Sequence, residues 1–494
     1  MFIKLRHFFL QEKTIVGLLY VALFLFCLYP YGDYDWGWHF KYGEYFIKTG
    51  HIMRSDVWSW SMPGYQWINH EWLFDVLVYV LTSSVGFTGL SIAGALIVTF
   101  AFYLSLKDLK LHYVWKGILA FFYAYLLEII VFQGLRSQSV GILMLAVLGY
   151  LLRLSQKQKI VFILLPLFFL IFANLHGYSV FGILIFGIAV FQSFMHSFEK
   201  EGRRIAFTLQ NQFLYTLASF TVSVVFTLIN PFGIGIYKEV FHHFNNELLS
   251  LVLEWTPVPY WTLINFVIIL YSGVLTFFIA RKSWGKRFYE IDYYQIGIFL
   301  LLFYPSYTAR RYVPVFVVST LPFYASYLSQ LRIKLDSYKS TILIASVACV
   351  IAIEIGVVNR VLTKSLFHYG YKEYCIYGST CSEELVQYLY AHPPQGRGLN
   401  FYDWGGYLIG RGVNMKVFVD GRMHLWETPK GYKPMLDYAA IYYGGRAEVF
   451  AEYNFNWVLV PANSNMAEVL RRGLAGPYKK MYEDSKAVYY VKTK

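Results

Sequence analysis

The chain has 494 residues, of which 57% are hydrophobic, 20% aromatic and only 15% charged, and its mean hydropathy is +0.43. Soluble domains carry about 25% charged residues, so this chain is too poor in polar side chains to cover a soluble body of its size. The same figures exclude a disordered chain, a collagen-like fibre and a disulfide-framed secreted module. The composition predicts an α-helical polytopic membrane protein that lies in the bilayer.

The formal net charge of +13 would also suit a nucleic-acid-binding protein. The basic residues, however, fall in short clusters between apolar runs, as the topogenic loops of membrane proteins do. No basic stripe interleaved with base-stacking aromatic residues runs along the chain. We therefore expect no nucleic-acid partner.

Apolar runs near bilayer length recur along the chain and predict membrane-spanning helices. The first run follows a basic segment that contains Lys4, Arg6 and Lys13, without a small-residue cleavage site after it, so it is typical of an uncleaved signal anchor. The runs cover residues 14–30, 88–106, 117–132, 137–152, 160–174, 177–196, 212–229, 262–281, 291–304, 312–329 and 340–358.

A further apolar run, 72–85, is ambiguous, and the charges of the loops decide its place. The basic loops are assigned to the cytoplasm together with the N-terminus, because positive charge favours that side. They comprise residues 107–116, 153–159, 200–204, 281–287 and 332–338, whereas the intervening short loops hold Arg136, Lys238, Arg310 and Arg311. That pattern requires an odd number of crossings before residue 107, so 72–85 lies along the membrane and 88–106 crosses it.

The expected topology is thus eleven spans in the cytoplasmic membrane, with the N-terminus inside and the C-terminus outside. Residues 32–87 then form one long external loop that holds six of the thirteen Trp residues. Because Trp favours the headgroup region, we expect this loop to form interfacial helices on the outer face of the membrane.

The composition changes after residue 361, which divides the chain into a membrane domain, 1–361, and an extracytoplasmic α/β domain, 362–494. The pattern predicts a helix over 382–391 and strands over 397–402, 416–420, 456–461 and 486–492. Gly405-Gly406 and Gly410-x-Gly412 lack the spacing and context of a nucleotide-binding loop. Cys375 and Cys381 could close a small disulfide if this domain lies outside, and a metal pair is disfavoured.

The densest group of ionisable residues begins where the first span leaves the membrane, with Asp33, Asp35, His39 and Lys41. A carboxylate there could bind a divalent cation or act as a general base on an acceptor hydroxyl. The alternative is a solvated loop in which Asp caps a helix. His70 and Glu71 form a second group, which could equally be a capping and anchoring cluster, and Asp75 is interpreted as structural.

Several later positions carry polar or charged side chains at the outer membrane boundary. Each alone is explained structurally, for example by an ion pair between Arg136 and Glu128, but all are expected on the same side. Arg groups held outside by short loops suit a phosphate, which they bind bidentately. The candidate headgroup-binding residues are Arg136, His176, Glu254, Arg310 and Arg311.

No serine-nucleophile elbow, zinc-binding His-Glu-x-x-His, phosphate-cradling loop or iron–sulfur spacing occurs in the sequence. Hydrolase and ATP-driven pump functions therefore have no support. A transporter should place ionisable residues within its spans near the bilayer midplane, and here the spans are almost free of them.

Taken together, these features resemble the GT-C glycosyltransferase fold. More narrowly, the chain is similar to a bacterial multispan group related to the dolichyl-phosphate-mannose mannosyltransferases and the aminoarabinose transferases. The resemblance covers nearly the whole chain. Its motifs are Asp33-x-Asp35-Trp-x-Trp-His39-x-Lys41-x-Gly43-Glu44, Gly50-His-Ile, Asp56-x-x-Ser59, Trp67-Ile-Asn-His70-Glu71-Trp72-Leu73, Arg136-Ser-Gln138, Asn174-Leu-His176-Gly177, Asn230-Pro-Phe-Gly233, Glu254-Trp255, Ala309-Arg310-Arg311-Tyr312, Trp404-Gly-Gly-Tyr407 and Val419-Asp420-Gly421-Arg422.

The resemblance implies transfer of a sugar from a polyprenyl-phosphate donor to a glycan, lipid or protein acceptor at the outer face of the membrane. It places Asp33 or Asp35 at the catalytic centre, with Asp35 favoured. His39 and His70 would then either lie beside the catalytic carboxylate or act as metal ligands. A divalent cation, Mg²⁺ or Mn²⁺, is the cofactor it suggests, held by Asp33, Asp35 and His39. The Pro-Pro pair that the mannosyltransferases carry before the horizontal helix is replaced here by Glu71-Trp72. The resemblance therefore does not identify the donor sugar or the acceptor.

Two alternatives accompany this hypothesis. Asp420 and Arg422 either form an ion pair that fixes a tight turn or belong to a tail that caps the active site or binds the acceptor. The protein as a whole is expected to be an enzyme, and the competing interpretation is a non-catalytic glycan-assembly factor or a flippase for lipid-linked glycans.

Overall fold

The computed structural model describes residues 12–127, 133–201, 204–207, 210–243, 247–331, 369–378 and 380–493. The chain divides into two compact units, and each is described by itself. The helical unit comprises Met1–Tyr29, Ser91–Ile234 and Glu254–Thr363. The α/β unit comprises Pro30–Leu90, Gly235–Leu253 and Lys364–Lys494.

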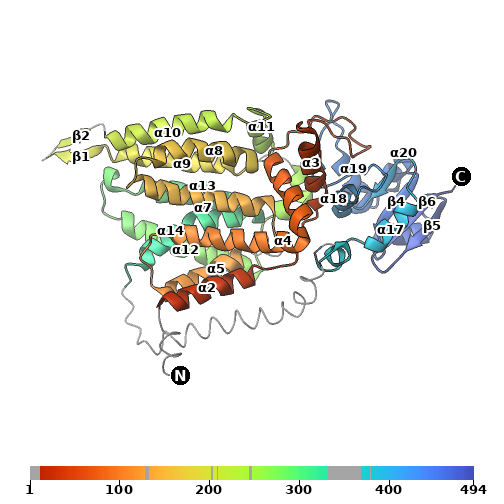
Figure 1. Cartoon of the computed structure of the whole chain (residues 1–494), viewed down its shortest axis with the longest axis horizontal. Helices are drawn as coiled ribbons and strands as arrows, with labels where there is room; N and C mark the ends of the chain where they lie inside the picture. The colour runs from red at the N-terminus through yellow and green to blue at the C-terminus, as the bar shows by residue number, and fades with distance from the viewer. Residues whose placement is uncertain are drawn as a thin grey trace, which may run out of the picture. The chain divides into compact units, whose positions relative to one another are not determined.

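Long apolar helices make up most of the helical unit, and Figure 1 shows α7, α8, α9, α10 and α13 side by side. Helix α8, for example, is apolar on every side: its Phe169 and Phe172 are fully enclosed in the core, while Ile163 and Ile171 lie on an exposed apolar face, as on a helix that contacts lipid. The elements are α2 (Glu12–Phe26), the second part of α4 (Trp72–Leu106), α5 (Tyr113–Leu126), α7 (Ser137–Ser155), α8 (Val161–Leu175), α9 (Ser179–Met195), β1 (Phe198–Glu201), β2 (Arg204–Phe207), α10 (Asn211–Thr227), η2 (Leu253–Trp255), α12 (Leu263–Ser283), η3 (Phe288–Glu290), α13 (Tyr293–Thr308), η4 (Arg310–Tyr312) and α14 (Val313–Leu328).

Three described helices are long and apolar enough to cross a membrane: Trp72–Leu106, Ser137–Ser155 and Leu263–Ser283. Shorter apolar helices occupy Lys13–Phe26, Val161–Leu175 and Ser179–Met195. Helices also coincide with the other expected spans up to residue 329, but the expected number of eleven crossings is not confirmed. The span expected over 340–358 lies outside the described residues, as does Glu128.

Helix α4 is broken at Gly86, whose backbone torsions, φ 64° and ψ −167°, are accessible almost only to glycine. The break separates Trp72–Val85 from Phe87–Leu106, which matches the two apolar runs distinguished in the sequence. The first piece belongs to the α/β unit and most of the second to the helical unit. That 72–85 lies along the membrane stays a prediction.

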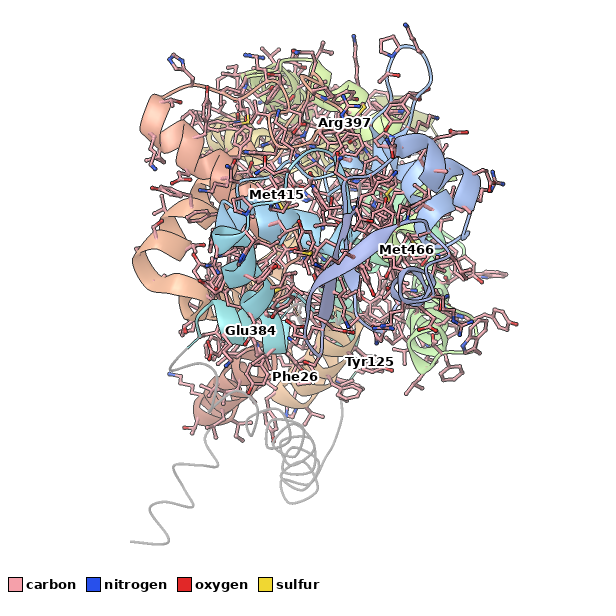
Figure 2. The ribbon with its side chains drawn as sticks, turned by 90° about the vertical axis from the view of Figure 1, so that its right-hand side faces the viewer. Phe26, Tyr125, Glu384, Arg397, Met415 and Met466 are labelled. Carbon is pink, nitrogen blue, oxygen red and sulfur yellow. A yellow bond between two sulfur atoms is a disulfide. The ribbon has the colours of Figure 1, made fainter. Side chains whose placement is uncertain are left out.

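The α/β unit is built around a small sheet with the strand order β3-β4-β6-β5, in which β3 and β4 are parallel and the other pairs antiparallel. Figure 2 shows this sheet with the helices around it, including α21, which carries Met466 into the core. The elements are α3 (Trp36–Thr49), the first part of α4, α11 (Gly235–His242), η1 (Glu247–Leu251), α16 (Tyr371–Glu373), η6 (Tyr374–Gly378), α17 (Glu383–Ala391), β3 (Gly398–Asn400), α18 (Tyr402–Arg411), η7 (Met423–Leu425), α19 (Pro434–Tyr442), α20 (Ala447–Tyr453), β4 (Trp457–Pro461), α21 (Asn465–Arg471), β5 (Tyr478–Glu483) and β6 (Ala487–Lys492).

The predicted helix 382–391 and three of the predicted strands correspond to α17, β3, β4 and β6. The strand predicted over 416–420 is wrong, because its backbone forms a single isolated bridge to the first loop, and its bonds to β3 go through the Asn400 side chain and not through a strand ladder. The Val417 N–H donates to the Trp58 carbonyl at 3.0 Å, and its own carbonyl accepts from the Trp60 N–H at 3.0 Å. Arg397, labelled in Figure 2, lies with its guanidinium 5.5 Å from the Trp60 ring centre. Residues of the first loop and of the C-terminal segment therefore share one folded unit.

Helices α3 and α18 cross at glycines. A Cβ atom on Gly37 would lie 1.8 Å from the Gly406 carbonyl oxygen, and one on Gly410 would lie 2.4 Å from the Gly37 Cα. A Cβ on Gly406 would lie 2.4 Å from the Tyr34 carbonyl oxygen. Glycine disfavours helix formation, but in α18 the close packing outweighs that cost. The glycines thus fix α3 against α18.

A buried guanidinium joins the first loop to the C-terminal segment. Arg422 Nε and Nη2 lie 2.8 Å and 2.7 Å from the two carboxylate oxygens of Asp420, and Nη1 lies 2.9 Å from Asp56 Oδ1. The side chains of Arg422, Asp56 and Asp420 are 0% exposed. Burial alone lowers the pKa of Arg422, but the two carboxylates raise it by more, so the net shift is upward and the charge is retained.

Aromatic rings enclose this ion network. The Arg422 guanidinium lies 4.8 Å from the ring centre of Trp58 and 5.0 Å from those of Trp67 and Trp426. The face of an indole attracts a cation, and the rings also exclude water. The structure therefore supports the interpretation of Asp420 and Arg422 as an ion pair that fixes a turn, and adds Asp56 as a second partner.

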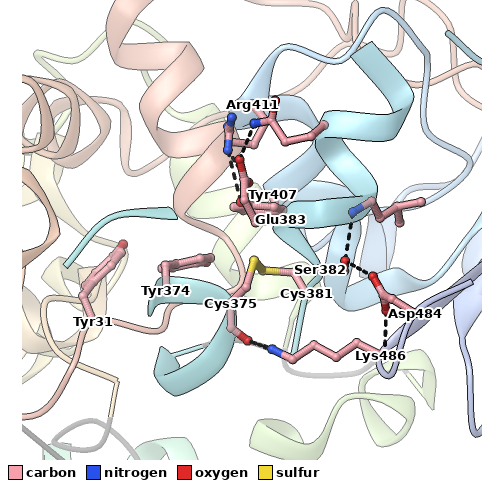
Figure 3. The surroundings of a disulfide bond; sticks show 12 residues. Tyr31, Tyr374, Cys375, Cys381, Ser382, Glu383, Tyr407, Arg411, Asp484 and Lys486 are labelled. Atoms are coloured by element: carbon pink, nitrogen blue, oxygen red, sulfur yellow. Dashed lines mark hydrogen bonds and ion pairs between the residues drawn. A yellow bond between two sulfur atoms is a disulfide. The ribbon is translucent and has the colours of Figure 1, made fainter. Parts of the chain in front are cut away.

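A disulfide joins Cys375 and Cys381, as the sequence allowed (Figure 3). Lys486 donates to the Cys375 carbonyl, and Ser382 Oγ lies 2.5 Å from Asp484 Oδ2. On the other side of the disulfide, Tyr374 Oη donates to the Asp33 carbonyl at 2.5 Å. The disulfide loop thus connects the sheet to the first-loop motif.

We expect Gly406→Ala to destabilise the protein by about 1–3 kcal/mol, because an added methyl group must push α18 away from the chain at Tyr34. Gly117→Ala is the matched control, since Gly117 lies in α5 with nothing within 4 Å of its Cβ position and gains helix propensity. The measurement is the thermal unfolding midpoint of the purified proteins in detergent. An unchanged midpoint for Gly406→Ala would contradict the close crossing.

We expect Arg422→Met to cost about 3–5 kcal/mol, because it leaves two buried carboxylates without their cation. A triple variant, Arg422→Met with Asp56→Asn and Asp420→Asn, should recover much of that loss because no buried charge remains. Denaturant unfolding of the three proteins measures the difference. A triple variant no more stable than the single one would argue against charge burial as the cause.

Candidate functional site

The first-loop motif places Asp33 and Asp35 just before and at the N-terminus of α3. Asp35 is the N-cap residue, and its N–H donates to Asp33 Oδ1 at 3.3 Å. Asp33 is only 2% exposed, and its carbonyl accepts the Tyr374 hydroxyl. Asp33 therefore has structural contacts through both its backbone and its side chain.

Asp35 is half-buried and lies against the turn that carries Arg422. Its Oδ1 accepts the Trp38 indole N–H at 2.9 Å. A Cβ atom on Gly421 would lie 1.8 Å from the same oxygen, so only glycine leaves room for this carboxylate. Of the two candidate bases, Asp35 is the more accessible to a substrate.

His39 is 2% exposed and is held by Asp75. Its Nδ1 lies 2.5 Å from Asp75 Oδ1, and Asn69 Nδ2 donates to Asp75 Oδ2 at 2.5 Å. The imidazole also packs on Trp38, with ring centres 3.6 Å apart, and on Phe74, at 5.0 Å. Asp75, which the sequence suggested was structural, thus orients the ring that follows the two candidate carboxylates.

The structure does not gather Asp33, Asp35 and His39 into a metal site. Among the residues it describes, no group of three or more His, Cys, Asp or Glu side chains could hold an ion together. His39 instead uses Nδ1 to bind Asp75. As arranged, these three residues do not form a binding site for a metal ion.

The remaining first-loop candidates form local pairs. Lys41 Nζ lies 2.7 Å from Glu44 Oε2, and His70 Nε2 lies 3.4 Å from Glu71 Oε1. Lys41 also lines a groove of about 550 Å³ between α3 and residues 52–58. Its charged lining residues are Lys41, Glu44, Lys48 and Arg54, so the groove carries a positive surplus.

In the helical unit, the structure brings the other predicted residues together at helix ends. Arg136, the N-cap of α7, pairs through Nη1 with Glu254 Oε1 in η2. The next residue, Trp255, lies under the guanidinium of Arg311 in η4, 4.0 Å from its ring centre. Arg136 pairs with Glu254, and the alternative partner Glu128 lies outside the described residues.

His176 and Arg310 belong to the same cluster. His176 is the C-cap of α8, and its Nδ1 accepts the Tyr178 N–H at 3.0 Å, so the neutral ring carries its hydrogen on Nε2. Tyr178 Oη in turn donates to the Arg311 carbonyl at 3.1 Å. The Arg310 N–H donates to the Thr256 carbonyl at 3.0 Å.

This headgroup cluster, defined as Arg136, His176, Glu254, Arg310 and Arg311, holds three guanidinium groups and one carboxylate. Burial lowers the pKa of Arg311, but Tyr178 and Glu254 raise it by more, so the net shift is upward. The cluster therefore keeps a positive surplus, which can bind an anionic group such as a phosphate.

Asp403, in the first turn of α18, was not singled out from the sequence. Burial raises its pKa to about 6, so it is a candidate proton acceptor near neutral pH. Asp403 directly precedes the Trp404-Gly-Gly-Tyr407 motif. Its place beside that motif is the sequence feature from which it could have been identified as a candidate.

No family model matches the chain, and no curated protein matches it either. Solved structures, in contrast, match the chain. The apo oligosaccharyltransferase of Archaeoglobus fulgidus matches with a TM-score of 0.54 and 12% identity, over 91% of this chain and 69% of that one. The oligosaccharyltransferase AglB of the same organism, in complex with an inhibitory peptide and a dolichol-phosphate, matches with a TM-score of 0.55 and 12% identity, over 97% and 74%. The chain therefore has the fold of these enzymes, which is the GT-C fold, with mainly helical structure and a small C-terminal sheet.

Proposed function

We propose that the protein is a membrane glycosyltransferase that transfers a sugar from a polyprenyl-phosphate-linked donor to an acceptor at the outer face of the cytoplasmic membrane. The observation that carries this proposal is the likeness in fold over 97% of the chain to a protein solved with a dolichol-phosphate and a peptide. Those two ligands represent a lipid-linked phosphate and an acceptor.

The headgroup cluster supplies the second argument. A departing lipid phosphate gains negative charge as the glycosidic bond breaks, and fixed guanidinium groups stabilise that charge. Arg136 at the start of α7 and the adjacent Arg310 and Arg311 of η4 come from two separate segments and gather at the ends of helices in one unit. We assign them to the phosphate of the donor.

In the proposed reaction, Asp35 accepts the proton of the acceptor nucleophile while the nucleophile attacks the anomeric carbon. The bond from that carbon to the phosphate oxygen breaks, and the lipid phosphate leaves with the electron pair. Asp35 suits this role because it is half-buried, and Trp38 and Gly421 set the position of its carboxylate. Asp33 and His39 position the N-terminal turn of α3.

The competing function is a glycan-assembly factor or a flippase that binds lipid-linked glycans without catalysing transfer. It would use the same phosphate-binding residues but would need no base at Asp35. The disulfide between Cys375 and Cys381 favours an oxidising compartment for the α/β unit, which agrees with the proposed extracytoplasmic location.

We expect Asp35→Asn to lower the rate of sugar transfer at least about 100-fold, because the amide cannot accept the proton. The assay uses the purified protein with a panel of polyprenyl-phosphate sugars, and donor binding should be retained. Gly421→Ala should also lower the rate, since its methyl group displaces the Asp35 carboxylate. Transfer at the wild-type rate in Asp35→Asn would refute the role of Asp35 and favour the non-catalytic alternative.

We expect the double variant Arg310→Lys, Arg311→Lys to bind polyprenyl phosphate at least about ten times more weakly, because an ammonium group cannot form the bidentate contact of a guanidinium. Arg281→Lys with Lys282→Arg, at the last turn of α12, is the control for charge-conserving changes elsewhere. Equilibrium binding in detergent measures both. Equal affinity in the two double variants would remove the headgroup cluster from the proposal.

A further inference from the structure

Two imidazoles face each other in the α/β unit at a position that the proposed reaction does not use. His243 follows α11, and His424 lies in η7, two residues after Arg422. Their Nε2 atoms are 3.1 Å apart, and their ring planes meet at 67°. Residues 235–253 and the turn at Gly421 are thereby brought together through two histidines.

The opposite edges of both rings fix where their hydrogens lie. His243 Nδ1 is 2.7 Å from the Glu239 carbonyl oxygen, and His424 Nδ1 is 2.9 Å from the Gly421 carbonyl oxygen. A carbonyl oxygen only accepts, so both Nδ1 atoms must carry a hydrogen. In two neutral rings, both Nε2 atoms then present lone pairs to each other at 3.1 Å. That contact is repulsive unless a positive charge lies between them.

The separation of the nitrogens matches a shared metal ion. An imidazole nitrogen lies about 2.0–2.1 Å from zinc, so two ligands 3.1 Å apart subtend an angle of about 100° at the ion. That angle is close to the tetrahedral value. The bonds from Nδ1 to backbone carbonyls are also the contacts that orient metal-binding histidines and select the Nε2 lone pair for the metal.

We propose that His243 and His424 bind a divalent first-row transition-metal ion of the zinc class through their Nε2 atoms, with water in its other positions, because no group of three or more His, Cys, Asp or Glu side chains among the described residues could hold an ion. Neutral imidazole is a ligand that such ions prefer. A third imidazole, that of His70, lies nearby with its ring centre 6.2 Å from that of His243, so the surroundings of the pair are polar. The inference is independent of the proposed glycosyl transfer.

The ion would act as a clip within the α/β unit. It would hold His243, at the end of α11, against the segment that runs from Asp420 through Gly421 to His424. Gly421 contributes the carbonyl that orients His424 and also leaves the space that Asp35 occupies. The metal would therefore stabilise the turn against which the Asp35 carboxylate lies.

The test is metal binding by the full-length protein, purified in detergent and stripped with a chelator. Titration with Zn²⁺ against a chromophoric chelator should show one site, and Co²⁺ should give the absorption bands of a nitrogen-ligated ion. His243→Ala and His424→Ala should each weaken Zn²⁺ binding at least 100-fold, and the double variant should be no worse than either single one. His424→Cys should restore binding, because a thiolate is also a zinc ligand; this outcome separates a lost ligand from a misfolded protein.

His392→Ala is the matched control. The His392 Nδ1 also bonds a backbone carbonyl, that of Tyr388 at 3.2 Å, but its exposed ring stacks on Tyr388 with ring centres 4.3 Å apart. Its Zn²⁺ affinity should equal that of the wild type. A wild-type protein that binds no Zn²⁺ and shows only a proton shared between the two rings by NMR would overturn the proposal, as would equal affinity in His424→Ala and the wild type.

Discussion

The buried charge of Arg422 is the constraint on which the α/β unit depends. A guanidinium enclosed by three indole rings is stable only with carboxylate partners, and these come from Asp420 nearby and from Asp56, far away in the sequence. The first loop and the C-terminal segment must therefore fold together. Because the tight turn at Gly421 lies between the two paired residues Asp420 and Arg422, the same network determines where the Asp35 carboxylate can lie.

Glycines are as important as the charged residues for the position of the Asp35 carboxylate. Gly37, Gly406 and Gly410 allow α3 and α18 to approach until backbone atoms touch, and α3 begins directly after Asp35. Several glycines destabilise α18 as a helix. They also allow the close crossing that fixes the start of α3. Gly406 and Gly410, which do not fit a nucleotide-binding loop, thus have a packing role.

The sequence predicted what depends on residue type and local pattern. Apolar runs located the long helices, turn residues located β4 and β6, and the spacing of Cys375 and Cys381 allowed their pairing. It missed what depends on distant partners. The 416–420 segment has the alternation of a strand but bonds to Trp58 and Trp60, and the meeting of His243 with His424 joins segments separated by 181 residues. Such contacts leave no local pattern, and the roles assigned to the site residues stay predictions.

The arginines of the chain differ in how many carboxylates neutralise them, and this bears on which of them could bind a phosphate. Arg422 is neutralised by two carboxylates, whereas the three guanidinium groups of the headgroup cluster share the single carboxylate of Glu254, which pairs with Arg136. The Glu254 carboxylate also acts on Arg311, whose pKa it raises. Trp255 supports Arg311 from one face without cancelling its charge. The cluster therefore keeps a surplus of positive charge, and the proposed binding of a lipid phosphate would draw on the two adjacent guanidinium groups of η4 together with that of Arg136.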